Sequence, residues 1–134
     1  MKSNVLLRNW PPILWALMIL LLTGLPGSYF PQIVSFWDWL SPDKVVHLLL
    51  FGILSFLMLW SNRQQYFESK KRSLISFVLI SGTIYGGLTE FLQAFVFVGR
   101  HGNIFDFFAN MTGTFSGFAL FVLIIQKNNQ KRKR

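Results

Sequence analysis

Four long apolar segments dominate the chain and constrain its fold more than any other feature. They cover roughly residues 11–25, 45–60, 74–98 and 104–125, and polar or basic stretches separate them. At about 1.5 Å of rise per residue the shortest reaches ~22 Å, against a hydrocarbon core about 30 Å thick. Backbone groups in lipid must find hydrogen-bond partners within the protein, as they do in a helix. The pattern therefore predicts an all-α integral membrane protein, a bundle of four transmembrane helices.

The composition suits a bilayer better than water. Hydrophobic residues make up 52% of the 134 residues and charged residues 13%, whereas a soluble domain carries about 25% charged residues. The 15 Phe and 5 Trp add apolar surface that a soluble fold of this length has too little interior to bury. The length itself suits a single domain.

Basic residues account for the formal charge of +8 and set the expected orientation. Of the 13 Lys and Arg, 11 lie before the first segment, between the second and third, or after the fourth. The positive-inside rule places these stretches, and both termini, in the cytoplasm. We expect a membrane domain over residues 1–126 and a basic cytoplasmic tail over residues 127–134, with anionic inner-leaflet lipids as partners. Basic residues that flank spans in this way argue against nucleic acid as a partner.

The first segment leaves two readings open. Pro11 and Pro12 suit the first turn of a helix, and the segment stops at Leu25-Pro26-Gly27. It is short for a span, so it either extends back through residues 5–7, with Arg8 reaching to the interface, or tilts less than the others. A signal peptide is the alternative, since Lys2 and Arg8 precede the apolar stretch. We rank it second because no small-x-small cleavage site follows.

Polar residues gather at one depth, near the outer ends of the last three segments. Asp43 and His47 are four residues apart and share a helix face. Glu90 lies 16 residues beyond Leu74, so it reaches the same level on the third helix. Ionisable groups within spans are costly and are by default candidates for function. The candidate ligand-binding residues are Asp43, Lys44, His47, Glu90, Gln93, Arg100, Asp106 and Asn110.

Small residues continue the polar stripes toward the cytoplasm. Gly82 and Gly86 precede Glu90 at spacings of four, and Gly113 and Gly117 follow Asp106 on one face of the fourth helix. Glycines at this spacing let two helices approach closely. We therefore expect the third and fourth helices to pack together and to hold a polar pocket at their outer ends, joined by His47.

Each polar residue also has a structural explanation. Asp43 could cap the second helix, Lys44 could reach lipid phosphates, and Glu90 could pair with Arg100. The amides of Gln93 and Asn110 could join neighbouring helices. His101 is expected in an exposed loop. We expect no metal and no cofactor: there is no cysteine, neither HxxxH nor HExxH spacing occurs, and one histidine with two carboxylates is a thin ligand set.

In combination and order, the polar motifs resemble the VanZ-like family. The matching motifs are Asp43-Lys44-x-x-His47, Tyr85-Gly86-x-x-x-Glu90-x-x-Gln93, Gly99-Arg100, and Asp106-x-x-Ala109-Asn110-x-x-Gly113. The family is named for an accessory membrane protein associated with teicoplanin resistance in bacteria. The resemblance implies a multi-pass protein of the bacterial cytoplasmic membrane that serves the cell envelope. It implies no particular reaction.

Three functions are compatible with these residues. The favoured one is a pocket that binds a polar or lipid-linked envelope molecule, such as an envelope precursor or a glycopeptide, and so affects glycopeptide susceptibility. The alternative is an intramembrane enzyme with His47 as base, Glu90 or Asp106 as acid, and Arg100 or Lys44 holding a phosphate. A proton or ion pathway through His47 and Glu90 comes third, because no titratable residue continues the path through the inner half. The sequence leaves the oligomeric state open.

Overall fold

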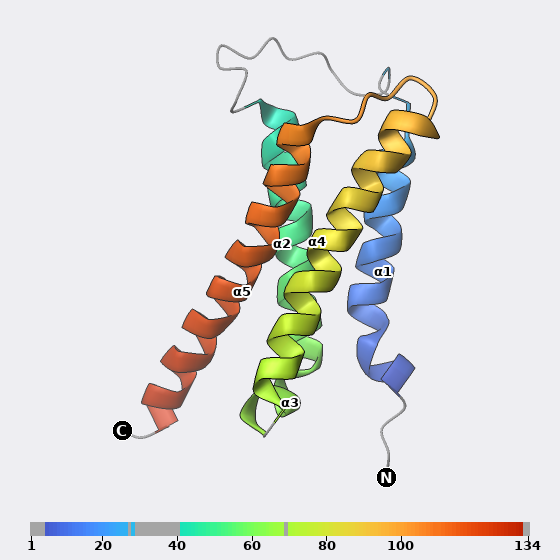
Figure 1. The fold of residues 1–134 in the computed structure, drawn as a ribbon. Coiled ribbons are helices and arrows are strands. Elements are labelled where there is room, and N and C mark those ends of the chain that lie inside the picture. The colour runs from blue at the N-terminus through green and yellow to red at the C-terminus, as the bar shows by residue number, and fades with distance from the viewer. Residues whose placement is uncertain (1–4, 27, 29–40, 69, 133–134) are drawn as a thin grey trace.

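The computed structural model describes residues 5–26, 28, 41–68 and 70–132, and within them the chain is helical, without strands. Four long helices and one short helix follow in the order α1 Val5–Gly24, α2 Pro42–Ser61, α3 Arg63–Phe67, α4 Lys71–Phe95 and α5 Ile104–Arg132. The long helices run alternately up and down (Figure 1), so the beginning of α1 and the end of α5 lie at the same end of the molecule, beside α3. We call this the inner end and the opposite one the outer end.

Membrane character follows from length and hydropathy together. Three helices are long and apolar enough to cross a bilayer, namely Pro42–Ser61, Lys71–Phe95 and Ile104–Asn128. α1 is not among these three, although its 20 residues would reach about 30 Å. The predicted all-helical membrane class is confirmed at this level, while a fourth span and the orientation of the termini stay predictions.

Helix bounds differ from the expected ones at three places. α1 begins at Val5, which confirms the alternative in which the first segment extends back through residues 5–7, and Pro11 and Pro12 lie inside the helix and not in its first turn. With this extension the helix reaches the thickness of a bilayer core. α4 ends at Phe95, three residues early, and the chain turns at Gly99 with a positive φ of 73°. α5 continues through most of the predicted tail, of which residues 133–134 lie outside the described part of the chain.

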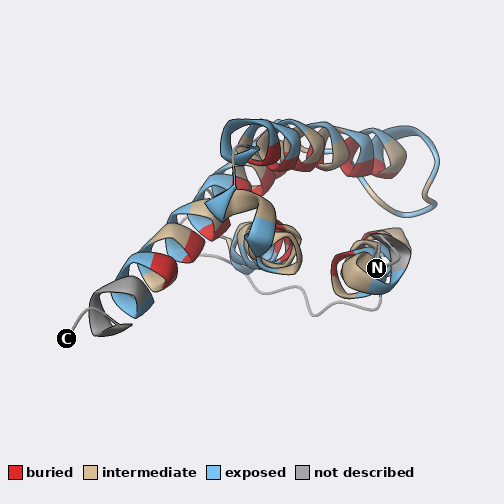
Figure 2. Ribbon diagram, turned by 90° about the horizontal axis from the view of Figure 1, so that it is seen from below, coloured by how far each residue is buried: buried red, intermediate tan, exposed pale blue. Residues whose placement is uncertain are grey.

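Large apolar side chains cover the outward faces of the helices. Figure 2 shows exposed residues along these faces and buried residues turned toward the neighbouring helices. On α4 the outward stripe consists of Phe77, Ile80, Ile84, Leu88 and Phe91, each 47–66% exposed. A soluble monomer rarely exposes a continuous apolar surface of this kind. Acyl chains are the natural neighbours of such faces.

The buried interior changes character from the inner end to the outer end. An apolar cluster at the inner end joins α2, α4 and α5, and it consists of Leu59, Leu74, Val78, Phe121 and Ile125. Near the middle, Ile19 of α1 packs with Phe51 and Leu54 of α2. The outer end instead buries polar side chains, among them His47 and Asn110. The apolar cluster therefore lies between this polar layer and the inner end.

Glycines bring the backbones of α2 and α5 into direct contact. A Cβ added to Gly113 would collide with the carbonyl of Leu48, and one added to Gly117 with the carbonyl of Gly52. In return, a Cβ on Gly52 would lie 3.3 Å from the carbonyl oxygen of Gly113. Close approach of helices through small residues is typical of membrane proteins. We call this contact the α2–α5 seam.

The glycines of α4 face α5, as expected, but those of α5 do not return the contact. Gly82 lies against Thr114, and Gly86 lies against Asn110. The expectation that the glycines of α4 and α5 pack against each other is therefore wrong. Gly113 and Gly117 pack against α2 and belong to the α2–α5 seam. The two contacts together place α5 beside both α2 and α4, which brings three helices to the polar layer.

Candidate functional site

Three buried side chains from three helices form the centre of the polar layer. Nδ1 of His47 lies 2.9 Å from Oδ1 of Asn110, and Nδ2 of Asn110 donates to Oε1 of Glu90 at 3.2 Å. The three residues are 4%, 0% and 8% exposed, respectively. Asn110 also donates to the carbonyl of Gly86 at 3.4 Å. The amide of α5 thus links α2 to α4.

These hydrogen bonds assign the protons on His47. The amide nitrogen of Asn110 is used as a donor twice, so its oxygen is the atom left to accept from the imidazole. Nδ1 of His47 therefore carries a hydrogen. In the neutral ring Nε2 is then the nitrogen with a free lone pair, and no described residue donates a hydrogen bond to it.

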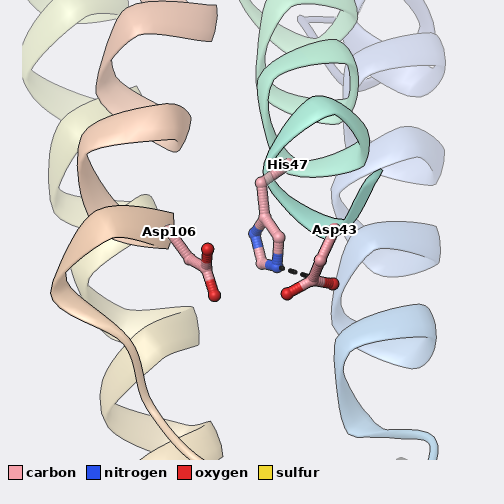
Figure 3. A group of neighbouring side chains, drawn as sticks. All are labelled: Asp43, His47 and Asp106. Atoms are coloured by element: carbon pink, nitrogen blue, oxygen red, sulfur yellow. Dashed lines mark ion pairs between the residues drawn. The ribbon is translucent and has the colours of Figure 1, made fainter. Parts of the chain in front are cut away.

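Nε2 of His47 faces the carboxylate of Asp43. It lies 3.9 Å from Oδ1 of Asp43, one turn earlier on α2. Figure 3 shows the carboxylate of Asp106, at the start of α5, on the other side of the imidazole. One ring nitrogen of His47 and one oxygen from each aspartate lie within 4.8 Å of one another. We call these three residues the outer triad.

Lys44 is the cation beside the outer triad. Its Nζ lies 3.5 Å from Oδ1 of Asp106 and donates to Oγ of Ser41 at 3.1 Å. Oδ1 of Asp106 is nevertheless buried and accepts no hydrogen bond within the described part of the chain. The side chain of Asp106 is only 6% exposed. The ion pair with Lys44 is the contact of this oxygen within the described residues, and at 3.5 Å it is longer than a close charge-assisted hydrogen bond.

The charge of the cluster is negative and its opening is at Asp43. Asp43, Glu90 and Asp106 supply three carboxylates, whereas Lys44 supplies one fixed positive charge and His47 a second only when protonated. The side chain of Asp43 is 56% exposed, whereas those of Lys44 and Asp106 are 13% and 6% exposed. A ligand from outside would therefore meet Asp43 first.

Glu90 is held on both carboxylate oxygens. Oε1 accepts from Asn110, and Oε2 accepts the backbone N–H of Asn103 at 3.1 Å. The carbonyl of Asn103 in turn accepts from the backbone of Asp106 at 2.9 Å. Glu90 thereby fixes the start of α5 and the position of Asp106. Asn103 is a positioning residue that the sequence analysis missed. Its side chain also accepts the N–H of Phe105 at 2.9 Å, and an Asn directly before a helix is the N-cap signal that could have revealed it.

Two of the predicted residues lie elsewhere at the outer end. Gln93 donates to the carbonyl of Thr23 at 3.3 Å. Arg100 donates through Nε to the carbonyl of Leu25 at 2.8 Å and through a terminal nitrogen to that of Leu22 at 3.3 Å. These contacts satisfy carbonyls at the C-terminal end of α1, which have no partner within the helix. The structure thus brings six of the eight predicted residues together and uses the other two to attach α1.

An apolar groove runs down from the cluster on the outside of the α2–α5 seam. It has a volume of about 230 Å³, and its walls are formed by Leu48, Leu49, Gly52, Ile53, Phe56, Ser116, Gly117 and Leu120. Leu48 follows Lys44 by four residues, so Lys44 lies one helical turn above the upper end of the groove. The groove therefore ends about one helical turn below the polar cluster, none of whose six residues lines it.

A larger cavity of about 480 Å³ lies at the other end, between α1, α2 and α4. Its walls are mostly apolar, and Arg8, Asn9, Asn62 and Gln65 lie around its inner part. None of the six clustered residues lines it. It is separate from the polar layer.

Comparison with known proteins gives one match. The family model described as VanZ/LLP1 matches residues 13–125, which include all four long helices in whole or in large part. Neither a curated protein nor a solved structure matches the chain. The matched range contains every residue of the polar cluster. The chain belongs to the VanZ/LLP1 family.

Proposed function

We propose that this chain is a four-span VanZ-like protein of the bacterial cytoplasmic membrane, with cytoplasmic termini and an outward-facing site. The site binds a polar or lipid-linked envelope molecule and thereby affects susceptibility to glycopeptides such as teicoplanin. Family membership supports the general class. The polar cluster lies at the start of α2 and of α5, at the end of the molecule opposite the beginning of α1 and the end of α5 (Figure 1), and this position supports an outward-facing site.

The observation that carries the proposal is the state of His47. Asn110 holds Nδ1 at 2.9 Å, while Nε2 is directed at Asp43, near the exposed edge of the cluster. A histidine that only joined helices would use both nitrogens within the protein, since one donates and the other accepts. In His47 one imidazole nitrogen is held by a hydrogen bond, and the other has no hydrogen-bond partner among the described residues. Such an imidazole is suited to contact a ligand.

The groove beside the α2–α5 seam supports a ligand with an apolar chain. Its walls are nearly all apolar, and its upper end is one turn below Lys44. A lipid-linked molecule would place its chain in the groove and its polar head against Lys44, Asp43 and Asp106. Lateral entry from the membrane needs no opening through the interior of the bundle.

An intramembrane enzyme is the second candidate, favoured by the same imidazole. A general base requires a fixed orientation, and the hydrogen bond from Nδ1 to Asn110 provides one. Asp106 is the better placed of the two candidate acids, because both oxygens of Glu90 accept hydrogen bonds from neighbouring residues. In this alternative Lys44 holds an anionic group of the substrate.

The test uses cells whose teicoplanin susceptibility depends on this protein. His47→Gln and Asp106→Asn keep the size of each side chain, so we expect normal abundance in the membrane with loss of the phenotype. His101→Gln is the matched control, since His101 is exposed in the loop before α5. Full phenotype in both site variants at normal abundance would refute the proposal. Loss of phenotype only in proportion to abundance would return the residues to a structural role.

Binding and catalysis are then separated by analysis of the cell lipids. If the chain is an enzyme, Asp106→Asn cells accumulate an unprocessed envelope lipid, which mass spectrometry detects. If it is a binding protein, the lipid profile is unchanged, while the lipid that co-purifies with the wild-type protein is lost from the variant.

A further inference from the structure

We propose that the outer triad of Asp43, His47 and Asp106 binds one divalent transition-metal ion, of which Zn²⁺ is the representative. This differs from the expectation drawn from the sequence, in which one histidine and two carboxylates made a thin ligand set. Folding changes that assessment, because it places one ligand atom from each of the three residues within 4.8 Å of the other two. Cation binding here does not require the lipid-linked ligand proposed above.

The donor atoms suit a zinc-type ion. Imidazole nitrogen and carboxylate oxygen are both common zinc ligands at roughly 2.0–2.2 Å, and sites with three protein ligands keep one position open. Ligand atoms around a tetrahedral ion at these lengths are roughly 3.4 Å apart. The distance of 3.9 Å between Nε2 of His47 and Oδ1 of Asp43 is close to that value. Asp43 is the half-exposed member, so its side chain is free to close the remaining gap.

The surroundings of His47 are those of a metal ligand. Metal-bound histidines almost always donate their other ring N–H to an oxygen acceptor, which fixes the ring and its tautomer. Asn110 accepts that hydrogen bond at 2.9 Å, and Asn110 is itself held by Glu90 and by the carbonyl of Gly86. Nδ1 is therefore engaged inside the protein, and Nε2 is the nitrogen available to an ion.

Asp106 supplies the observation that points to a cation as ligand. Its Oδ1 is buried and accepts no hydrogen bond within the described part of the chain. Two more carboxylates, Asp43 and Glu90, lie close to the same imidazole. Lys44 is the ion-pair partner of Oδ1, at 3.5 Å. A divalent ion in the outer triad would both coordinate this oxygen and compensate the excess of negative charge.

Lys44 and the ion compete in this arrangement. An ammonium beside Asp106 stabilises the carboxylate without the ion and repels a second cation. The length of the lysine side chain allows Nζ to withdraw toward Ser41, to which it already donates at 3.1 Å. Removal of the ammonium should therefore strengthen metal binding. If the Lys44–Asp106 ion pair were only structural, its removal would not increase the affinity for metal.

The test is direct metal binding to the purified full chain in detergent, without a histidine tag and in the presence of millimolar Mg²⁺. Equilibrium dialysis followed by elemental analysis should give one Zn²⁺ per chain. His47→Gln and Asp106→Asn should each weaken binding by more than about tenfold, the loss typical of even an outer-shell change at a metal site. Lys44→Met should strengthen binding several-fold. His101→Gln, which removes the other histidine, should leave binding unchanged.

A variant could lose the metal simply because it fails to fold, so a second measurement is made on the wild-type protein. Co²⁺ in place of Zn²⁺ should give visible absorption bands of the intensity characteristic of four-coordinate nitrogen and oxygen ligation. Absence of both Zn²⁺ retention and these bands in the wild-type protein overturns the proposal. So does retention that survives Asp106→Asn and His47→Gln but is lost in His101→Gln.

Discussion

Gly117→Ala tests the α2–α5 seam with a single methyl group. An alanine normally stabilises a helix by about 1 kcal/mol relative to glycine. At position 117, however, the new Cβ would lie against the carbonyl of Gly52, well inside the 3.0 Å below which real Cβ contacts essentially do not occur. The colliding atoms belong to backbone, so no side chain is available to rotate away. The two helices must separate by about 1 Å, which forfeits a quarter to a half of the dispersion energy at each contact of the seam.

The expected outcome is a net loss of stability of about 2 kcal/mol, within the range typical of overpacked interiors. Reversible unfolding by SDS in mixed micelles, followed by circular dichroism, measures the loss. Gly87→Ala is the matched control, because its Cβ would lie 3.5 Å from the ring of Phe107, an ordinary contact. It should be neutral or slightly stabilising. Wild-type stability of Gly117→Ala, or equal losses in both variants, would refute the backbone contact as described.

Three further predictions concern orientation and the polar layer. A reporter fused after Arg134 should be active only in its cytoplasmic form, because 11 of 13 basic residues lie on the segments assigned to that side; labelling of the fused end from outside intact cells would contradict this. Arg100→Met should destabilise the protein by about 2 kcal/mol in the SDS titration, since it removes charged donors from the carbonyls of Leu22 and Leu25; an unchanged midpoint would mean that water satisfies these carbonyls equally well. Asn110→Ala should cost about 1–3 kcal/mol, because it leaves the buried Nδ1 of His47 without its acceptor, and an intact midpoint would argue against the assigned tautomer.

The depth and composition of the candidate site were predictable from the sequence. Helix length predicts that three residues lie at one level, and their spacing predicts that they face inward: His47, Glu90 and Asn110. The structure joins these residues by hydrogen bonds. Depth alone does not say which neighbour a residue meets. Gln93 and Arg100 lie at the same outer end, yet they contact α1 because α1 packs beside α4.

The packing partners were less predictable. Gly52 is a single glycine within an apolar segment, without a second small residue four positions away, so nothing marked it as part of the α2–α5 seam. The glycines of α5 suggested a contact with α4, but periodicity gives a face and not the identity of the helix against it. Pro11 and Pro12 suggested a helix start, which the apolar residues before them outweigh.

The attachment of α1 has a consequence for the synthesis of the protein. Arg100 is made 75 residues after Leu25 and 78 after Leu22, the carbonyls to which it donates. At about 5–20 residues per second, the ribosome needs roughly 4 to 16 seconds to supply that guanidinium. During this interval the carbonyl of Leu22 has the N–H of Leu25 as a donor at 3.4 Å, and water or lipid headgroups take the place of the guanidinium. The end of α1 is thus completed by a residue that is made only after α4, and a chain that stops at the end of α4 lacks this contact.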